Sequence, residues 1–190
     1  MKKKLYPVPS SKGLVCSIPM YYGTTSGTLL YDETGNGYNG TATNSPVPKF
    51  PAFQFTAASS MYIDIGAAYN GIKTTALWVK PNAISGTDYP IDLNGTDYLT
   101  IETGTLTANG FAGGTTVLYV DGVVGTGVTA DWHFIAITDT SGKNASDLDI
   151  GRKDAGYFDG LIAGVRLYKD VLTASEIRSL YEITRQRYAR

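Results

Sequence analysis

Apolar residues in this 190-residue chain come in short runs, separated by clusters of Gly, Asn, Asp, Ser and Pro. Runs bounded by such turn residues are typical of β-strands, and many short strands at this spacing predict an antiparallel sandwich or barrel. Among the runs are LVCSI, SMYIDI, TTALWVK, TVLYVDG, WHFIAIT and GLIAGVRLY. No stretch before residue 170 has helical periodicity. We expect a core that includes Phe55, Ile63, Trp78 and Val79.

The pattern changes near the end of the chain. Thr173 is followed three residues later by Glu176, which is the spacing of a capping box, so Thr173 is the predicted N-cap of a helix. Ile177, Leu180 and Tyr181 then fall on one helical face. Because this face is short, the helix needs to pack on the sandwich, where we expect it to cover an open end of the core.

Charge divides the chain into three parts. Residues 1–12 hold four lysines and no acid, and residues 178–190 hold four arginines and one glutamate, so the two ends carry +7 and residues 13–177 carry −8. We therefore predict an extended arm (1–12), a sandwich (13–172), and a helix with a basic tail (173–190). The basic ends are expected to bind copies of the same chain or other particle proteins; the alternative is a pair of solvated, frayed termini.

Several protein classes are disfavoured by the composition. The basic start lacks the apolar segment of a secretory signal, and no apolar run approaches the ~18 residues of a membrane span. The single cysteine, Cys16, cannot form an internal disulfide and is expected as a buried apolar residue. We expect no nucleic-acid partner and no membrane insertion.

Motifs spread along residues 12–183 resemble a known family. The segments YDETGNGYNGT, ALWVKP and YFDGLIAGVRLYKDVLTASEIRSLY are similar to signatures of the laminin-G-like jelly rolls of the concanavalin A-like lectin/glucanase superfamily. The resemblance implies an all-β, antiparallel two-sheet jelly-roll sandwich with a short C-terminal helix. Two acidic segments of the family pattern are absent here, replaced by residues 20–22 and by Ala163 and Gly164.

Catalysis is not expected. The glucanases of this superfamily carry Glu-x-Asp-x-Glu or a close variant on one strand, and this chain has no such run. Asp147 and Asp149 share a strand face, which we interpret as a solvated face. His133, the single histidine, is expected to make a structural hydrogen bond. No catalytic residue is therefore predicted, and a divergent glycosidase remains an alternative.

The loop YDETGNGYNGT has two interpretations. Asp32, Asn36 and Asn39 lie among glycines, and their oxygens suit a hard cation such as Ca²⁺, which takes 6–8 oxygen ligands. The alternative is an Asx-turn with left-handed glycines, which needs no metal.

Two groups of residues are candidates for sugar binding. Tyr21 and Tyr22 lie in a Gly- and Thr-rich loop, where aromatic rings can stack on a pyranose and hydroxyls can hydrogen-bond. Asp154 and Tyr157 in RKDAGYFDG form the second group. The alternative for each tyrosine is an ordinary strand or rim position.

These observations favour a non-catalytic structural, decoration or adhesion protein of a phage or virion-like assembly that also binds glycans. Such a protein is made in the cytoplasm and ends on a virion or extracellular particle surface without a secretory signal. The alternatives are a soluble carbohydrate-binding lectin and the divergent glycosidase.

Overall fold

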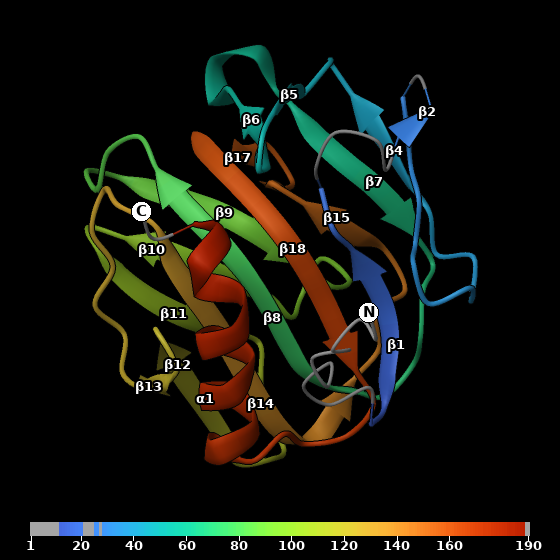
Figure 1. The fold of residues 1–190 in the computed structure, drawn as a ribbon, viewed down its shortest axis with the longest axis vertical. Coiled ribbons are helices and arrows are strands. Elements are labelled where there is room, and N and C mark those ends of the chain that lie inside the picture. The colour runs from blue at the N-terminus through green and yellow to red at the C-terminus, as the bar shows by residue number, and fades with distance from the viewer. Residues whose placement is uncertain (1–11, 21–24, 27, 189–190) are drawn as a thin grey trace, which may run out of the picture.

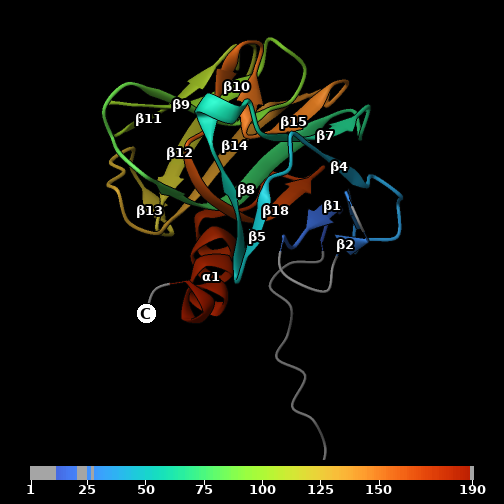
Figure 2. The same cartoon turned by 90° about the horizontal axis from the view of Figure 1, so that it is seen from above.

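The structure is a computed structural model that describes residues 12–20, 25–26 and 28–188. Two antiparallel sheets pack face to face, and one helix lies against the outer face of one sheet, so the molecule has three layers (Figure 1, Figure 2). The chain crosses repeatedly between the sheets. The predicted all-β, two-sheet jelly roll with a short C-terminal helix is confirmed.

Sheet A carries the helix on its outer face. Its strands run in the order β13-β12-β14-β8-β18-β6-β5, and β1 pairs with β18 beside β6. Their bounds are β1 (Leu14–Ile18), β5 (Val47–Lys49), β6 (Ala52–Phe55), β8 (Ile72–Pro81), β12 (Thr116–Val120), β13 (Val123–Val124), β14 (His133–Lys143) and β18 (Gly160–Tyr168).

Sheet B forms the other layer, in the order β11-β10-β9-β15-β7-β4-β3-β2. Its strands are β2 (Thr25–Ser26), β3 (Leu29–Leu30), β4 (Gly40–Thr43), β7 (Tyr62–Gly66), β9 (Thr87–Asp92), β10 (Tyr98–Glu102), β11 (Thr105–Asn109) and β15 (Leu148–Ile150). The strands β16 (Arg152–Lys153) and β17 (Gly156–Tyr157) pair only with each other and contact β9. Short 3₁₀ turns occur at η1 (Ala57–Ser59) and η2 (Arg185–Arg187).

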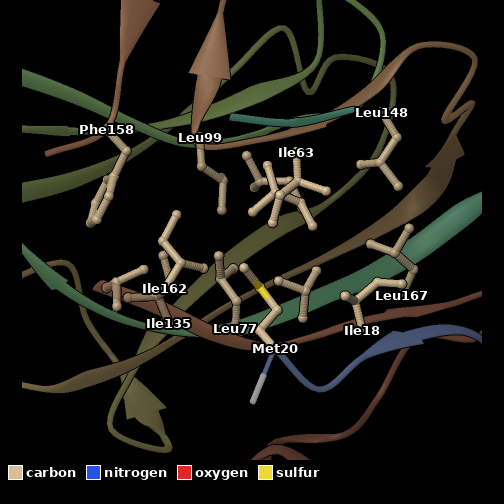
Figure 3. Close-up of a cluster of buried hydrophobic side chains, with 14 of the residues drawn as sticks. Ile18, Met20, Ile63, Leu77, Leu99, Ile135, Leu148, Phe158, Ile162 and Leu167 are labelled. Carbon is tan, nitrogen blue, oxygen red and sulfur yellow. The ribbon is translucent and has the colours of Figure 1, made fainter. Parts of the chain in front are cut away.

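The main core lies between the two sheets. Alternate residues of the strands point inward from both sides and interdigitate, as Figure 3 shows for Ile63, Leu99 and Leu148 opposite Leu77 and Ile162. Phe55 and Ile63 are fully buried in this cluster, together with Val79 and Cys16. The predicted core positions and the buried cysteine are confirmed, and burial raises the pKa of the Cys16 thiol far above its ordinary range.

A second core lies between sheet A and α1 (Ala174–Thr184). Trp78, also predicted to be buried, belongs to this cluster and packs with Ile177 and Leu180 of the helix. The expectation that the helix covers an open end of the sandwich is therefore wrong: it covers the outer face of a sheet (Figure 2). The reason is that outward-facing residues of β8 and β14 are themselves apolar.

Local signals at the start of the helix are confirmed. Thr173 is the N-cap: its side chain accepts a hydrogen bond from the backbone N–H of Glu176, and the Glu176 carboxylate accepts one from the backbone N–H of Thr173. The hydrogen bonds from Thr173 lower the pKa of Glu176. Within the described residues, none of the helices has the length and apolar character needed to cross a membrane. The predicted arm lies almost entirely outside those residues.

Candidate functional site

The most elaborate polar surface lies on the outer face of sheet B, around the β16–β17 hairpin. After β15, Gly151 turns the chain outward with a φ of +83°, and a Cβ here would lie 2.8 Å from the Phe55 ring. The hairpin then crosses over β9 and returns to the core at the fully buried Phe158. The hairpin is therefore anchored at both ends by the main core.

Four half-exposed tyrosines surround this hairpin in two pairs. The rings of Tyr62 and Tyr157 are 6.4 Å apart, and those of Tyr89 and Tyr98 are 6.3 Å apart. We call this surface the hairpin face; it comprises the four tyrosines together with Asp64, Asp92, Asp147, Asp149, Arg152, Lys153 and Asp154.

Strand geometry explains why these side chains share one surface. Tyr62 and Asp64 flank the inward-pointing Ile63, so alternation directs both outward. In β9, Tyr89 and Pro90 lie opposite a single β10 residue, which is a β-bulge, and such bulges re-aim side chains. The bulge brings the Tyr89 ring beneath the hairpin, where a Cβ on Gly156 would lie 2.3 Å from it.

Three aspartates form a row beneath the hairpin. Asp149 is the direct cross-strand partner of Asp92 on one side and of Asp64 on the other. Asp92 and Asp149 are only 4% and 3% exposed. Like charges in directly opposed positions destabilise a sheet, so this row requires nearby cations.

The two cations of the hairpin meet this requirement. Arg152 donates to Asp149 Oδ2 from Nε at 2.7 Å and from Nη2 at 2.5 Å, and its guanidinium lies 3.8 Å from the centroid of the Tyr62 ring. Lys153 is paired with Asp154 and lies 5.2 Å from the centroid of the Tyr98 ring. The hairpin is therefore attached to sheet B by the Arg152–Asp149 ion pair and by two cation–π contacts.

Burial perturbs the acids of the row. Burial raises the pKa of Asp149 to about 6, against the lowering effect of Arg152, and the neighbouring Asp64 and Asp147 raise it further. Burial also raises the pKa of Asp92, although its Oδ1 accepts hydrogen bonds from the N–H groups of Asn94 and Gly95. Within the described residues, Asp149 Oδ1 is buried without a hydrogen-bond partner.

Two of the four residues that the sequence predicts to bind sugar lie on the hairpin face. Asp154 lies in the hairpin turn and Tyr157 on its second strand, so the structure places both on the hairpin face. Tyr21 and Tyr22 lie outside the described residues. Asp149 is buried and paired with Arg152, so its interpretation as part of a solvated strand face is wrong, because the hairpin folds back over it.

The Asp32 loop has the geometry of a turn. Asp32 Oδ1 accepts from the N–H groups of Ser17 at 2.9 Å and Thr34 at 3.0 Å, and Oδ2 accepts from the Thr34 hydroxyl at 2.7 Å. Asn39 Oδ1 accepts from the Asp32 N–H at 2.9 Å, and Asn36 Nδ2 donates to a backbone carbonyl at 2.8 Å. Oxygens already surrounded by N–H and O–H donors do not fit Ca²⁺, so these residues fit the Asx-turn interpretation, and the calcium prediction still awaits a chelation test.

His133 makes the expected structural hydrogen bonds. Its Nε2 accepts from the backbone N–H of Thr129 at 3.1 Å, so the proton is on Nδ1, which donates to Asp121 at 2.8 Å. Asp121 also accepts from the N–H of Phe134 at 3.0 Å. The histidine therefore fastens the loop before β14 to the turn after β12.

Comparisons with known proteins support the fold assignment. The family model described as the concanavalin A-like lectin/glucanases superfamily matches residues 103–178. No curated protein sequence matches the chain.

Among solved structures, domain 4 of an extracellular arabinanase from Geobacillus stearothermophilus, determined in complex with arabinotriose, is similar at 16% identity and a TM-score of 0.56, covering 88% of this chain and 98% of that one. Trypanosoma rangeli sialidase is similar at 16% identity and a TM-score of 0.63, but the match covers 96% of this chain and only 34% of the sialidase.

A structure of botulinum neurotoxin type C, whose cell entry depends on interaction with two ganglioside molecules, is similar at 11% identity and a TM-score of 0.55, covering 90% of this chain and 51% of that one. The chain thus spans about a third of the sialidase and about half of the neurotoxin chain. At these identities the likeness shows the fold alone. The resemblance of this chain to the laminin-G-like jelly rolls of the concanavalin A-like lectin/glucanase superfamily is therefore confirmed, by the family model over residues 103–178 and by the fold of the sandwich.

Proposed function

We propose that this chain is a non-catalytic glycan-binding module and that the hairpin face is its binding surface. The observation that carries the proposal is the arrangement of four partly exposed tyrosines in two pairs around a hairpin that the Arg152–Asp149 ion pair fixes to sheet B. Tyrosine offers a ring face to the apolar side of a sugar and a hydroxyl to its polar edge, and a rigid sheet holds both in place at little entropic cost.

The similar structures support this proposal at the level of the fold. The arabinanase domain was solved in complex with arabinotriose, and cell entry of the neurotoxin depends on interaction with two ganglioside molecules, so proteins that contain a sandwich of this kind interact with glycans. Fold alone does not assign function, which is why the proposal rests on the hairpin face.

We propose that the hairpin face binds glycans without hydrolysing them. A glycosidase needs two carboxyl groups that reach the scissile bond. Asp92 and Asp149 are covered by the hairpin and are hydrogen-bonded to backbone N–H groups and to Arg152 respectively. They hold the hairpin, and a substrate has no access to them.

The test is binding of an immobilised glycan panel to the wild type and to two single variants, Tyr98→Ala and Tyr157→Ala. Phe50→Ala is the matched control, since Phe50 is a 74% exposed aromatic residue next to sheet A, away from the hairpin face. We expect each tyrosine variant to weaken binding about tenfold and the control to bind normally. Equal binding by all four proteins would place the site elsewhere, and release of reducing sugar by the wild type would refute the non-catalytic assignment.

We further propose that the module serves as an adhesion or decoration protein of a virion-like particle, attached through its basic ends. The support is the contrast between +7 at the ends and −8 in residues 13–177. Deleting residues 2–12 is expected to abolish self-association or particle attachment, measured by native mass spectrometry, while glycan binding persists. A truncated protein that assembles as well as the full chain would refute this role, and a monomeric full chain that binds sugars would favour a soluble lectin.

A further inference from the structure

The charges and hydrogen-bonding groups of the hairpin face restrict the class of glycan. From the side chains that interact there, five are acidic: Asp64, Asp92, Asp147, Asp149 and Asp154. Only two are basic, Arg152 and Lys153, and each is already paired with an aspartate of the same surface. The surface therefore has an excess of negative charge at neutral pH.

The hydrogen-bonding capacity of the surface is equally one-sided. Arg152 donates from two of its nitrogens to Asp149, and the Lys153 ammonium donates to Asp154. On the acceptor side, the carboxylates that a glycan can reach are those of Asp64, which is exposed, and Asp154, whose side chain is 78% exposed. Unsatisfied acceptors need donors, and a sugar hydroxyl is a donor whereas a carboxylate or sulfate ester is an acceptor only.

We infer that the hairpin face selects uncharged glycans and rejects those that carry carboxylate or sulfate groups, an inference that rests on the proposed binding function. This sets the chain apart from the sialidase and from the ganglioside-dependent neurotoxin, which share its fold only. The tyrosine rings supply stacking to either class of glycan, so the charge of the surface decides between them.

The size of the preference follows from Coulomb's law. One negative charge of the protein about 8 Å from the carboxylate of a glycan weakens binding about twofold in water. A net excess of three negative charges therefore weakens the binding of such a glycan about tenfold at low salt. Salt at 0.5 M shortens the screening length to about half this distance, and the preference for the neutral glycan should then shrink to about twofold.

The experiment measures the affinity for matched pairs that differ only in charge. The pairs are the methyl ester of 3′-sialyllactose with 3′-sialyllactose itself, and methyl-esterified with free oligogalacturonides, at pH 7.5 and at low and high salt. We expect the neutral member of a bound pair to bind about tenfold more tightly at low salt. The double variant Asp64→Asn/Asp154→Asn removes two charges from exposed positions, and the one remaining excess charge should narrow the difference in affinity to about twofold.

The controls separate this inference from the proposed function. Tyr98→Ala identifies binding that occurs on the hairpin face. If the acidic member binds as tightly as the neutral one and loses affinity in Tyr98→Ala, the charge selection is wrong while the glycan-binding function stands. If neither member of any pair binds, or if binding ignores Tyr98→Ala, the proposed function fails and the inference fails with it.

Discussion

Replacing Trp78 with alanine should separate α1 from sheet A. The indole is 1% exposed, its ring centroid lies 4.7 Å from that of Tyr188 and 5.5 Å from that of Phe134, and Nε1 donates to the Thr184 hydroxyl at 2.9 Å. Truncating a large buried aromatic residue costs about 3–5 kcal/mol of unfolding free energy. For a chain of this size that loss lowers Tm by roughly 6–20 °C.

A conservative variant separates the cost of losing the aromatic ring from the cost of losing the hydrogen bond. Trp78→Phe keeps an aromatic ring but loses the donor to Thr184, so it should cost only about 1–2 kcal/mol. Urea unfolding followed by circular dichroism measures both losses, and hydrogen exchange of the α1 amides should accelerate strongly only in the alanine variant. A loss below about 1 kcal/mol for Trp78→Ala, or unchanged exchange in α1, would show that the second core does not hold the helix.

Three further predictions concern the acids and the hairpin. The pKa values of Asp149 and Asp88 in the folded protein are raised to about 6 from 3.8, so the folded state holds these protons more tightly than the unfolded state does. Their contribution to the free energy of unfolding is therefore complete below pH 3.8 and is lost as the pH rises through 6. Asp149→Asn should remove up to about 3 kcal/mol of this decline in urea titrations between pH 4 and 8, and an unchanged slope would contradict the assignment. Gly156→Ala places a Cβ 2.3 Å from a tyrosine ring, so the hairpin must shift and the affinity for glycan should fall several-fold. The control is Gly125→Ala, whose added Cβ meets nothing within 4 Å and should leave binding normal. Equal affinities of the two variants would argue against a fixed hairpin. Asp32→Ala should cost about 2–3 kcal/mol through its lost hydrogen bonds, and a chelator should leave the Tm of both proteins unchanged; a chelator-induced drop confined to the wild type would establish the calcium alternative.

Features that depend on neighbouring residues were predictable from the sequence. The capping box of Thr173 and Glu176 and the turn around Asp32 use partners only a few residues apart, and alternation in β7 already places Tyr62 and Asp64 on one face. The family resemblance, carried by motifs in nearly the familiar order, gave the sandwich.

The aspartate row and the second core could not be found in this way. Asp92 and Asp149 become neighbours only when β9 pairs with β15, which joins residues far apart in the chain. Likewise, the contact of Trp78 with Thr184 spans 106 positions. Short-range patterns do not contain the order of strands in a sheet, so the burial of Asp149 and the position of the helix both escaped prediction.

The three-layer arrangement gives the molecule two different sides, the helix-covered side of sheet A and the outer face of sheet B. β1 and α1 both belong to the sheet A side, whereas the hairpin face lies on the outer side of sheet B. The described part of the chain therefore begins and ends on the side opposite the tyrosines. Copies anchored to a common support by their ends would all present the hairpin face outward, and many weak sugar contacts would then act together as one strong attachment.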